Sequence, residues 1–166
     1  MEHSFGLLKP DCLKRGIEKE VLALVESAGL RIVAMKRVRL TRQQVDAVWP
    51  SCKREDFYED MVEFSTSGDC IVFIVEGENA INRLKDIVGH YEPSMAKEGT
   101  IRHLFGTSAR ENIIHSSKNE ETYKKEKALF FREELKIAKG DGRIKPPPFF
   151  FEPINICGLE KCRNCL

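Results

Sequence analysis

Hydrophobic and polar residues follow one another along the chain with two periods, one typical of strands and one typical of helices. Short apolar runs predict strands at residues 5–8, 30–40, 70–75 and 112–115. Apolar residues at helical spacing predict helices at residues 17–28, 41–49, 57–64, 80–88 and 117–137. The predicted elements therefore follow the order β-α-β-α-α-β-α-β-α.

Residues at the ends of the predicted helices support these boundaries. Gly29 and Gly89 each follow an apolar helical pattern, and glycine favours the backbone conformation that ends a helix. Thr41 is a candidate N-cap for the short helix that follows it. Ser117, with Glu120 three residues later, has the Ser-x-x-Glu form of a capping box and predicts the start of the last helix.

The order of the elements indicates the fold class. An antiparallel sheet of the split β-α-β type, with helices packed on it, accommodates this order. The run over 70–75 is apolar throughout, which predicts a central strand covered on both faces. The connection over 90–109 has no predicted element of its own, and loops of that length often carry function.

Composition describes one domain with a single core, since 42% of the residues are hydrophobic. The longest apolar run is too short to cross a bilayer, and no charged and then apolar leader precedes the first motif, so we expect a cytoplasmic protein without a membrane span. The six cysteines are expected to be reduced. The net charge of +1 gives no general attraction to nucleic acid, and the basic residues over 31–42 are expected to form a solvated strand face.

The chain divides into a domain over residues 1–138 and a Pro-, Phe- and Cys-rich extension over 139–166. The extension is too apolar for a free linker, so we expect it to dock on its own domain or on a neighbouring subunit. Cys157, Cys162 and Cys165 supply three thiols, one ligand short of a closed zinc site. A metal or redox role for these thiols is an open alternative.

Glu126 has two interpretations that depend on how the last helix packs. The residue lies three positions after Tyr123 and four before Phe130, so its carboxylate stands at the margin of an apolar helix face. It could pair with a nearby lysine at the surface. It could instead accept a hydrogen bond from one imidazole nitrogen of His115 and leave the other nitrogen free to attack.

Several short motifs carry a family resemblance: Lys9-Pro10-Asp11, Arg15-Gly16, Phe57-Tyr58, Ser67-Gly68, Gly77, Gly99-Thr100-Ile101-Arg102, Asn112 and His115. In this order and at these intervals, they resemble the nucleoside diphosphate kinase family. The resemblance implies an α+β, ferredoxin-like αβ sandwich with a four-stranded antiparallel sheet covered by helices. It also implies ping-pong transfer of a terminal phosphoryl group from a nucleoside triphosphate to a nucleoside diphosphate, with His115 as acceptor and donor.

The resemblance also implies roles for residues that, taken singly, have ordinary structural interpretations. Lys9 would reach the sugar and the transferred phosphate, and Asn112 would contact the sugar. Arg102 would hold phosphate oxygens with its guanidinium fork. Phe57 would stack on the base, and Glu126 would orient the histidine. Ser117 also matches a family serine near the site, although its capping role alone explains it.

Some positions depart from the family pattern. Lys85 stands where the resemblance implies a phosphate-binding arginine, and Tyr91 where it implies a threonine hydroxyl that bonds the diphosphate. Lysine keeps the charge but loses the bidentate fork. The usual Gly-Ser-Asp after the histidine is Ser-Ser-Lys, and the Trp49-Pro50 region replaces an expected tyrosine. We therefore expect altered nucleotide affinity, and a catalytically weakened nucleotide-binding or scaffolding module is the alternative.

The resemblance finally implies a cofactor and partners. Mg²⁺ would bridge phosphate oxygens and be held by substrate and water, so no dedicated metal ligands are expected. The partners would be nucleoside triphosphates and diphosphates, with neither membrane nor nucleic acid. The family also implies a homo-oligomer, a hexamer or a tetramer built from dimers.

Overall fold

The structure, a computed structural model, describes residues 1–132. The predicted extension over 139–166, its cysteines and the proposed boundary at 138 lie outside the described residues. The sheet and its helices follow in this order: β1 (Glu2–Leu8), α1 (Pro10–Lys14), α2 (Glu18–Ser27), β2 (Arg31–Arg39), α3 (Arg42–Val48), η1 (Pro50–Arg54), α4 (Tyr58–Thr66), β3 (Asp69–Gly77), α5 (Ala80–Val88), η2 (Pro93–Met95), α6 (Ile101–Phe105), β4 (Ile114–Ser116) and α7 (Glu120–Phe130).

The strands form one antiparallel sheet in the order β2-β3-β1-β4. The central pair β1 and β3 is in register from Glu2 opposite Gly77 to Leu8 opposite Ile71. At the edge, β4 places His115 directly opposite Leu7 of β1. This order confirms the ferredoxin-like αβ sandwich and the central position of the apolar strand over 70–75.

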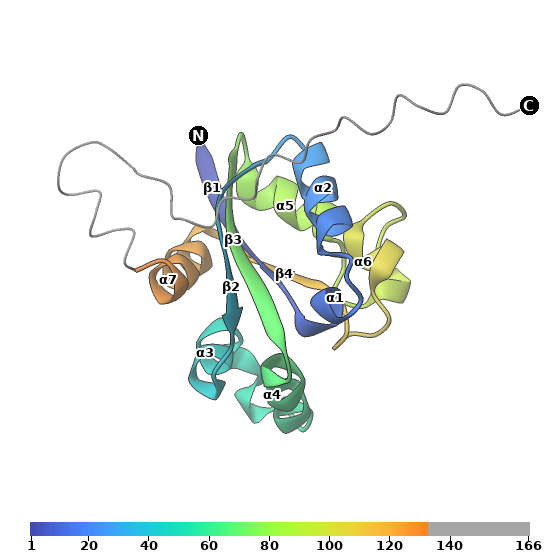
Figure 1. Ribbon diagram of the computed structural model, residues 1–166, viewed down its shortest axis with the longest axis vertical. Helices are drawn as coiled ribbons and strands as arrows, with labels where there is room; N and C mark the ends of the chain where they lie inside the picture. Colours follow the sequence, from blue (N-terminus) through green and yellow to red (C-terminus); the bar gives the residue numbers. More distant parts are fainter. Residues whose placement is uncertain (133–166) are drawn as a thin grey trace, which may run out of the picture. The chain divides into compact units, whose positions relative to one another are not determined.

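Two apolar cores cover the two faces of the sheet (Figure 1). On one face, α2 and α5 pack against residues that include Leu8 and Phe73. On the other, α3, α4 and α7 pack against residues that include Phe5 and Leu7. His115 shares the face of Leu7, because it is opposite that residue in the register. The nucleophile candidate therefore faces the side of the sheet that α7 covers.

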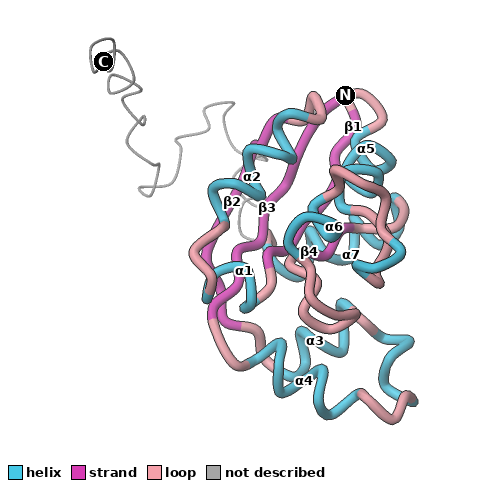
Figure 2. Tube along the Cα trace, turned by 90° about the vertical axis from the view of Figure 1, so that its right-hand side faces the viewer, coloured by secondary structure: helices cyan, strands magenta, loops and turns pink. Residues whose placement is uncertain are grey.

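The helix pair α3 and α4, joined by η1, lies at one end of the sheet in both views (Figures 1 and 2). Thr41 caps α3 as predicted, because its hydroxyl accepts the Gln44 N–H at 3.2 Å and the Gln44 side chain accepts the Thr41 N–H. We call residues 41–66 the helical hairpin. Trp49, which follows α3 in the hairpin, lies against His115 of β4.

The start of the last helix differs from the prediction. Asn119, and not Ser117, is the N-cap of α7: its side chain accepts the Thr122 N–H at 2.9 Å, and the Thr122 hydroxyl accepts the Asn119 N–H. The Ser117 hydroxyl instead donates to Glu126. The Ser-x-x-Glu pattern was misleading because Asn-x-x-Thr, two residues later, forms an equivalent reciprocal cap. Within the described residues the helix ends at Phe130.

Two short α-helices were not predicted, and neither were the 3-10 helices η1 and η2. Helix α1 begins at Pro10, where the sequence indicated only a loop, because proline fits the first turn of a helix. Helix α6 lies inside the connection over 90–109 and has only five residues, too few for a hydrophobic period to show. The last strand also starts later than predicted, at Ile114, because Ile113 has a backbone conformation that a strand cannot contain. No helix among residues 1–132 is long and apolar enough to cross a membrane.

Candidate active site

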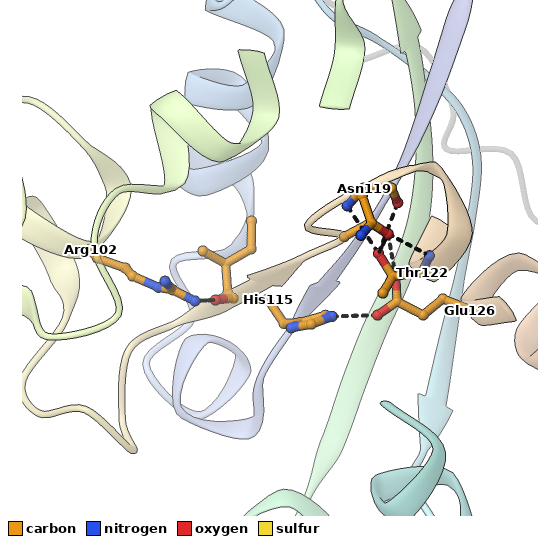
Figure 3. Close-up of polar contacts among 7 residues, drawn as sticks. Arg102, His115, Asn119, Thr122 and Glu126 are labelled. Atoms are coloured by element: carbon orange, nitrogen blue, oxygen red, sulfur yellow. Dashed lines mark hydrogen bonds and ion pairs between the residues drawn. The ribbon is translucent and has the colours of Figure 1, made fainter. Parts of the chain in front are cut away.

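The imidazole of His115 is held by a carboxylate from α7. Its Nε2 lies 2.6 Å from Oε1 of Glu126, and Figure 3 shows the two side chains pointing toward each other. A carboxylate accepts hydrogen bonds, so we assign the proton of the neutral imidazole to Nε2. That tautomer leaves the lone pair on Nδ1, which is the nitrogen that could act as a nucleophile.

Glu126 is buried, with 4% of its surface exposed. Its second oxygen accepts the hydroxyl of Ser117, so both oxygens of the carboxylate are engaged within the fold. Glu126 is therefore not a surface glutamate paired with a lysine, which was the alternative interpretation. A carboxylate fixed from both oxygens can hold the imidazole ring in one orientation.

Two aromatic rings also contact the imidazole. Trp49 lies edge to face with it at 5.1 Å between ring centroids and 72° between planes. Phe5 lies at 6.4 Å and 61° on the β1 side. Trp49 stands where the tyrosine of the family pattern was expected, and its indole extends the apolar core up to the histidine.

Lys9 occupies a buried position at the end of β1. Its ammonium donates to the carbonyl of Arg110 and to Oδ1 of Asn112 at 2.9 Å, and it lies 5.2 Å from the centroid of the Phe64 ring. Burial lowers the pKa of Lys9 to about 8, with the Arg102 charge adding to the effect and Asp11 opposing it. A buried ammonium that has lost most of its water is suited to binding an anion.

Asn112 connects Lys9 to the loop that precedes β4. Its Oδ1 accepts from Lys9, while its Nδ2 donates to the carbonyls of Tyr91 and Ala109, each at 2.9 Å. The amide is buried. The sequence-predicted pair of Lys9 and Asn112 is therefore brought into direct contact.

The backbone is strained two residues before the histidine. Ile113 has φ of +75°, which is rare for a β-branched residue. Its N–H donates to Oδ2 of Asp11 at 3.0 Å, and its carbonyl accepts the Lys9 N–H at 2.8 Å. The Lys-Pro-Asp motif thus fixes the turn that leads into β4, and burial raises the pKa of Asp11.

Arg102 projects from α6 toward β4 (Figure 3). Its two terminal nitrogens donate to the carbonyls of Gly89, at 3.1 Å, and Ile114, at 2.7 Å. Its Nε is buried and has no partner among the described residues. Burial lowers the pKa of Arg102 to about 10. A second, partly buried cation therefore bonds to the residue next to His115.

The remaining predicted residues lie at the surface. Phe57 is the N-cap of α4 and is 48% exposed, which leaves its ring face available. Tyr91 is 61% exposed and packs on the ring of His90, while its carbonyl accepts from Asn112. Lys85 is exposed on the last turn of α5 and makes no side-chain hydrogen bond or ion pair within residues 1–132. The structure thus brings His115 into contact with Glu126 and Lys9 into contact with Asn112. The side chains of Lys85 and Tyr91 bond to neither pair.

Sequence reasoning missed three residues that contact this group. Trp49 contacts His115, Asp11 holds Ile113, and Arg110 accepts from Lys9 through its carbonyl. For Asp11 the sequence did offer a signal, because this acidic residue stands close to Lys9, where the first turn of α1 begins. Trp49 and Arg110 make contacts between segments that are distant in sequence, and no local pattern indicates them.

Of the carboxylates close to the histidine, Glu126 has both oxygens bonded and Asp11 has one bonded and one buried without a partner among the described residues, and this bears on how a metal could bind. Glu126 bonds His115 and Ser117, and Asp11 bonds Ile113. Within the described part of the chain, no group of three or more His, Cys, Asp or Glu residues is arranged to hold a metal ion. This donor set fits a divalent cation that arrives bound to phosphate oxygens and keeps water ligands.

The fold and the site together define a class of protein. A four-stranded ferredoxin-like sheet carries on its edge strand a histidine with one nitrogen held and one available. Two cations, buried Lys9 and partly buried Arg102, bond to the segment that leads to that histidine. This is the arrangement of a phosphotransferase that uses histidine as its nucleophile.

The chain belongs to the nucleoside diphosphate kinase family, whose model matches residues 2–135. A nucleoside diphosphate kinase from Rhodopseudomonas palustris is 44% identical over 131 residues, which cover 79% of this chain and 94% of the relative. One from Chlorobaculum tepidum is 42% identical over 134 residues, which cover 81% and 96%.

Solved structures of the family share the fold. The apo crystal structure of the Encephalitozoon cuniculi nucleoside diphosphate kinase has a TM-score of 0.78 and 30% identity, and covers 81% of this chain and 92% of that one. A halophilic nucleoside diphosphate kinase from Halobacterium salinarum, solved in complex with CDP, has a TM-score of 0.76 and 29% identity, with coverage of 80% and 89%. The resemblance found in the motifs is confirmed at the level of the family and the fold.

Proposed function

We propose that His115 is the phosphoryl carrier of this nucleoside diphosphate kinase. The enzyme transfers the terminal phosphoryl group of a nucleoside triphosphate to a nucleoside diphosphate in two half-reactions. The observation that carries the assignment to His115 is its bond to buried Glu126, because it leaves Nδ1 as the nitrogen able to attack.

In the first half-reaction, Nδ1 of His115 attacks the terminal phosphorus. The N–P bond forms as the bond between that phosphorus and the bridging oxygen breaks, and the nucleoside diphosphate leaves with the bond's electron pair. Glu126 keeps the Nε2 proton in place and stabilises the positive charge that the imidazole acquires. In the second half-reaction, the terminal oxygen of another diphosphate attacks the same phosphorus, and the N–P bond breaks.

Lys9 and Arg102 supply positive charge for the transferred group. Phosphoryl transfer passes through a loose transition state in which charge spreads over the equatorial and leaving oxygens. Lys9 is buried and Arg102 is partly buried, so water screens their interactions with phosphate less than it would at the surface. Mg²⁺ would neutralise further phosphate charge, and it would be held by the nucleotide and water and not by side chains of the site.

Phe57 and Asn112 position the nucleoside in this proposal. The exposed ring of Phe57 offers a face for stacking, which discriminates little between bases. Asn112 and Lys9 form the neighbouring polar pair that would meet the sugar.

Lys85 and Tyr91 stand at the diphosphate end with altered chemistry, so we propose weaker diphosphate binding with the histidine chemistry retained.

The alternative of a catalytically weakened scaffold is not favoured. It depends on Lys85 and Tyr91 alone, and neither side chain contacts the group formed by His115, Glu126, Lys9 and Asn112. Steady-state kinetics that show ordinary saturation by diphosphates would count against altered affinity.

Labelling with γ-labelled ATP tests the proposed carrier. The expected result is an acid-labile, base-stable label on the wild-type chain that is lost in His115→Ala. His103→Ala removes an exposed histidine on α6 and is the matched control, which should label normally. Unlabelled wild-type protein with a folded circular dichroism spectrum, or label retained in His115→Ala, would refute the proposal.

The proposal also covers the location of the enzyme in the cell and the assembly of its chains. We propose a cytoplasmic location, where nucleotide substrates and reduced thiols are expected; Cys12, Cys52 and Cys70 are free in the structure. We also propose a homo-oligomer, a hexamer or a tetramer built from dimers. Light scattering coupled to gel filtration would measure the mass directly, and a monomer at micromolar concentration would contradict this part.

A further inference from the structure

Arg110 connects the proposed nucleotide site to the helical hairpin. Its carbonyl accepts the Lys9 ammonium, so its backbone lies against the pair of Lys9 and Asn112. Its side chain leaves in another direction: the guanidinium lies 2.8 Å from Oδ2 of Asp60 on α4. One residue thus joins the sugar side of the site to a helix of the hairpin.

The helical hairpin is also held together within itself. Arg42 donates to both oxygens of Glu59, with Nη1 at 3.1 Å, and this pair joins α3 to α4. Asp46 pairs with Lys53 at 2.9 Å and accepts the hydroxyl of Tyr58. These bonds make the hairpin a unit, and the Arg110–Asp60 pair is the one ion pair among residues 1–132 that ties this unit to the loop before β4.

Side chains of the hairpin enter the proposed site at three places, and one of them is Phe64 of α4, whose ring centroid lies 5.2 Å from the Lys9 ammonium. Phe57, the proposed base platform, begins α4 three residues before Asp60. Trp49, at the end of α3, contacts His115. The distance between the base platform and the sugar-binding pair therefore depends on how the hairpin is seated against the loop.

We infer that the Arg110–Asp60 ion pair sets nucleotide affinity by holding the helical hairpin in register with Lys9 and Asn112. Arg110 and Asp60 are positioning residues in this account, which rests on the proposed function of the site. Breaking the pair lets the platform and the sugar site separate, so binding weakens while His115 and its carboxylate keep their geometry. Both side chains are partly exposed, at 43% and 62%, so added salt screens the pair.

Kinetics of four full-length variants test the inference, with GTP as donor and ADP as acceptor. Arg110→Ala and Asp60→Asn should each raise the KM for ADP about two- to fivefold, the range expected for an exposed ion pair, with kcat little changed. The double variant should show no more than either single change, because both remove the same interaction. The exchanged pair, Arg110→Asp with Asp60→Arg, should recover most of the affinity.

The matched control is Glu59→Gln, which breaks the neighbouring Arg42–Glu59 pair inside the hairpin and should leave KM unchanged. Trp49 is the only tryptophan of the chain, so its fluorescence gives the Kd for ADP without turnover. The ratio of variant to wild-type Kd should fall toward one as sodium chloride rises from about 50 to about 500 mM.

Three results would overturn the inference: unchanged KM in both single variants, a raised KM in Arg110→Ala alone, or an equal rise in Glu59→Gln. The second would mean that Arg110 binds nucleotide directly. Labelling of each variant with γ-labelled ATP distinguishes failure of the ion-pair inference from failure of the proposed function. Labelled protein with unchanged KM contradicts the ion-pair account only, whereas unlabelled wild type contradicts the function.

Discussion

At the scale of single residues, the site depends on how buried charges are partnered. Glu126 has both oxygens bonded, to His115 and to Ser117, and Lys9 bonds Asn112 and a backbone carbonyl. The family resemblance implied the pairing of His115 with Glu126, whereas helical spacing alone put the carboxylate at the margin of the apolar face and left a surface lysine as the alternative partner. The resemblance placed Ser117 near the site, but the expected capping role hid its bond to Glu126, because Asn119 and not Ser117 caps α7.

Glu126→Gln tests the orienting role. The amide can still accept from Nε2, but it cannot stabilise the imidazole's positive charge in the transition state, so we expect kcat to fall about 10²-fold with little change in KM. Glu121→Gln is the control, because that exposed carboxylate on the same helix pairs only with Lys125. Equal kcat values for the two variants would remove Glu126 from the mechanism.

Lys9 should make both the stability of the protein and its nucleotide affinity depend on pH. Its folded-state pKa of about 8 lies below the unfolded value of 10.5, so the unfolded chain binds more protons between these values and stability rises with pH across that window. The same deprotonation removes a phosphate-binding charge, so nucleotide affinity of the free enzyme should fall as pH rises above about 8. Binding titrations from pH 7 to pH 10 with ADP would measure this, and a flat affinity would contradict it.

Lys9→Met separates the stability cost of this charge from its function. We expect loss of activity together with an unfolding free energy about 1–2 kcal/mol higher at pH 7, because a buried cation is replaced by an apolar side chain of similar length. Lys19→Met, at an exposed position, should change neither property. Urea unfolding monitored by circular dichroism gives the comparison, and a less stable Lys9→Met would show that its hydrogen bonds outweigh the burial cost.

At the scale of elements, the long periodic helices and the buried strands were predictable, and the short pieces that build the site were not. The central strand over 70–75 and the helix over 80–88 follow directly from apolar spacing and glycine. Helices α1 and α6 have five residues each, and their positions depend on contacts made across the chain. The turn at Ile113 is another such case, because Asp11 from a distant segment holds it.

Two alanine variants test the assignment of the α7 cap. Asn119→Ala should lower the unfolding free energy by about 1 kcal/mol, because it removes the acceptor for the Thr122 N–H. Ser117→Ala should leave the start of the helix intact and lower kcat, because Glu126 loses a hydrogen bond. Thermal unfolding and kinetics on both variants distinguish the roles, and the reverse pattern would restore Ser117 as the cap.

At the scale of the whole molecule, one strand order accounts for where the site lies. The edge position of β4 places His115 opposite Leu7 on the face that α7 covers. The family and this sandwich were predictable from the spacing of short motifs, because those motifs fix the turns and cations that the fold brings together. The seating of the helical hairpin was not, since it depends on Trp49, Asp60 and Arg110 meeting distant segments.

The domain boundary can be tested at this scale. A chain ending at residue 138 should unfold cooperatively and keep kcat, because among residues 1–132 the side chains from Phe5 to Phe131 already form two apolar cores. Zinc analysis of the truncated and full-length proteins addresses the thiols at Cys157, Cys162 and Cys165. Equal and negligible zinc in both would remove the metal alternative, and loss of cooperative unfolding on truncation would contradict the boundary.

The most direct test of the central claim is a chase of the isolated phosphoenzyme. The wild-type protein is labelled with γ-labelled ATP, freed of nucleotide by gel filtration and mixed with unlabelled GDP. If a phosphohistidine is the intermediate, about one label per chain will be found on His115 and will be transferred completely to GDP as labelled GTP. Label that stays on the protein, or label that moves to GDP only when ATP is present, would contradict a phosphohistidine intermediate.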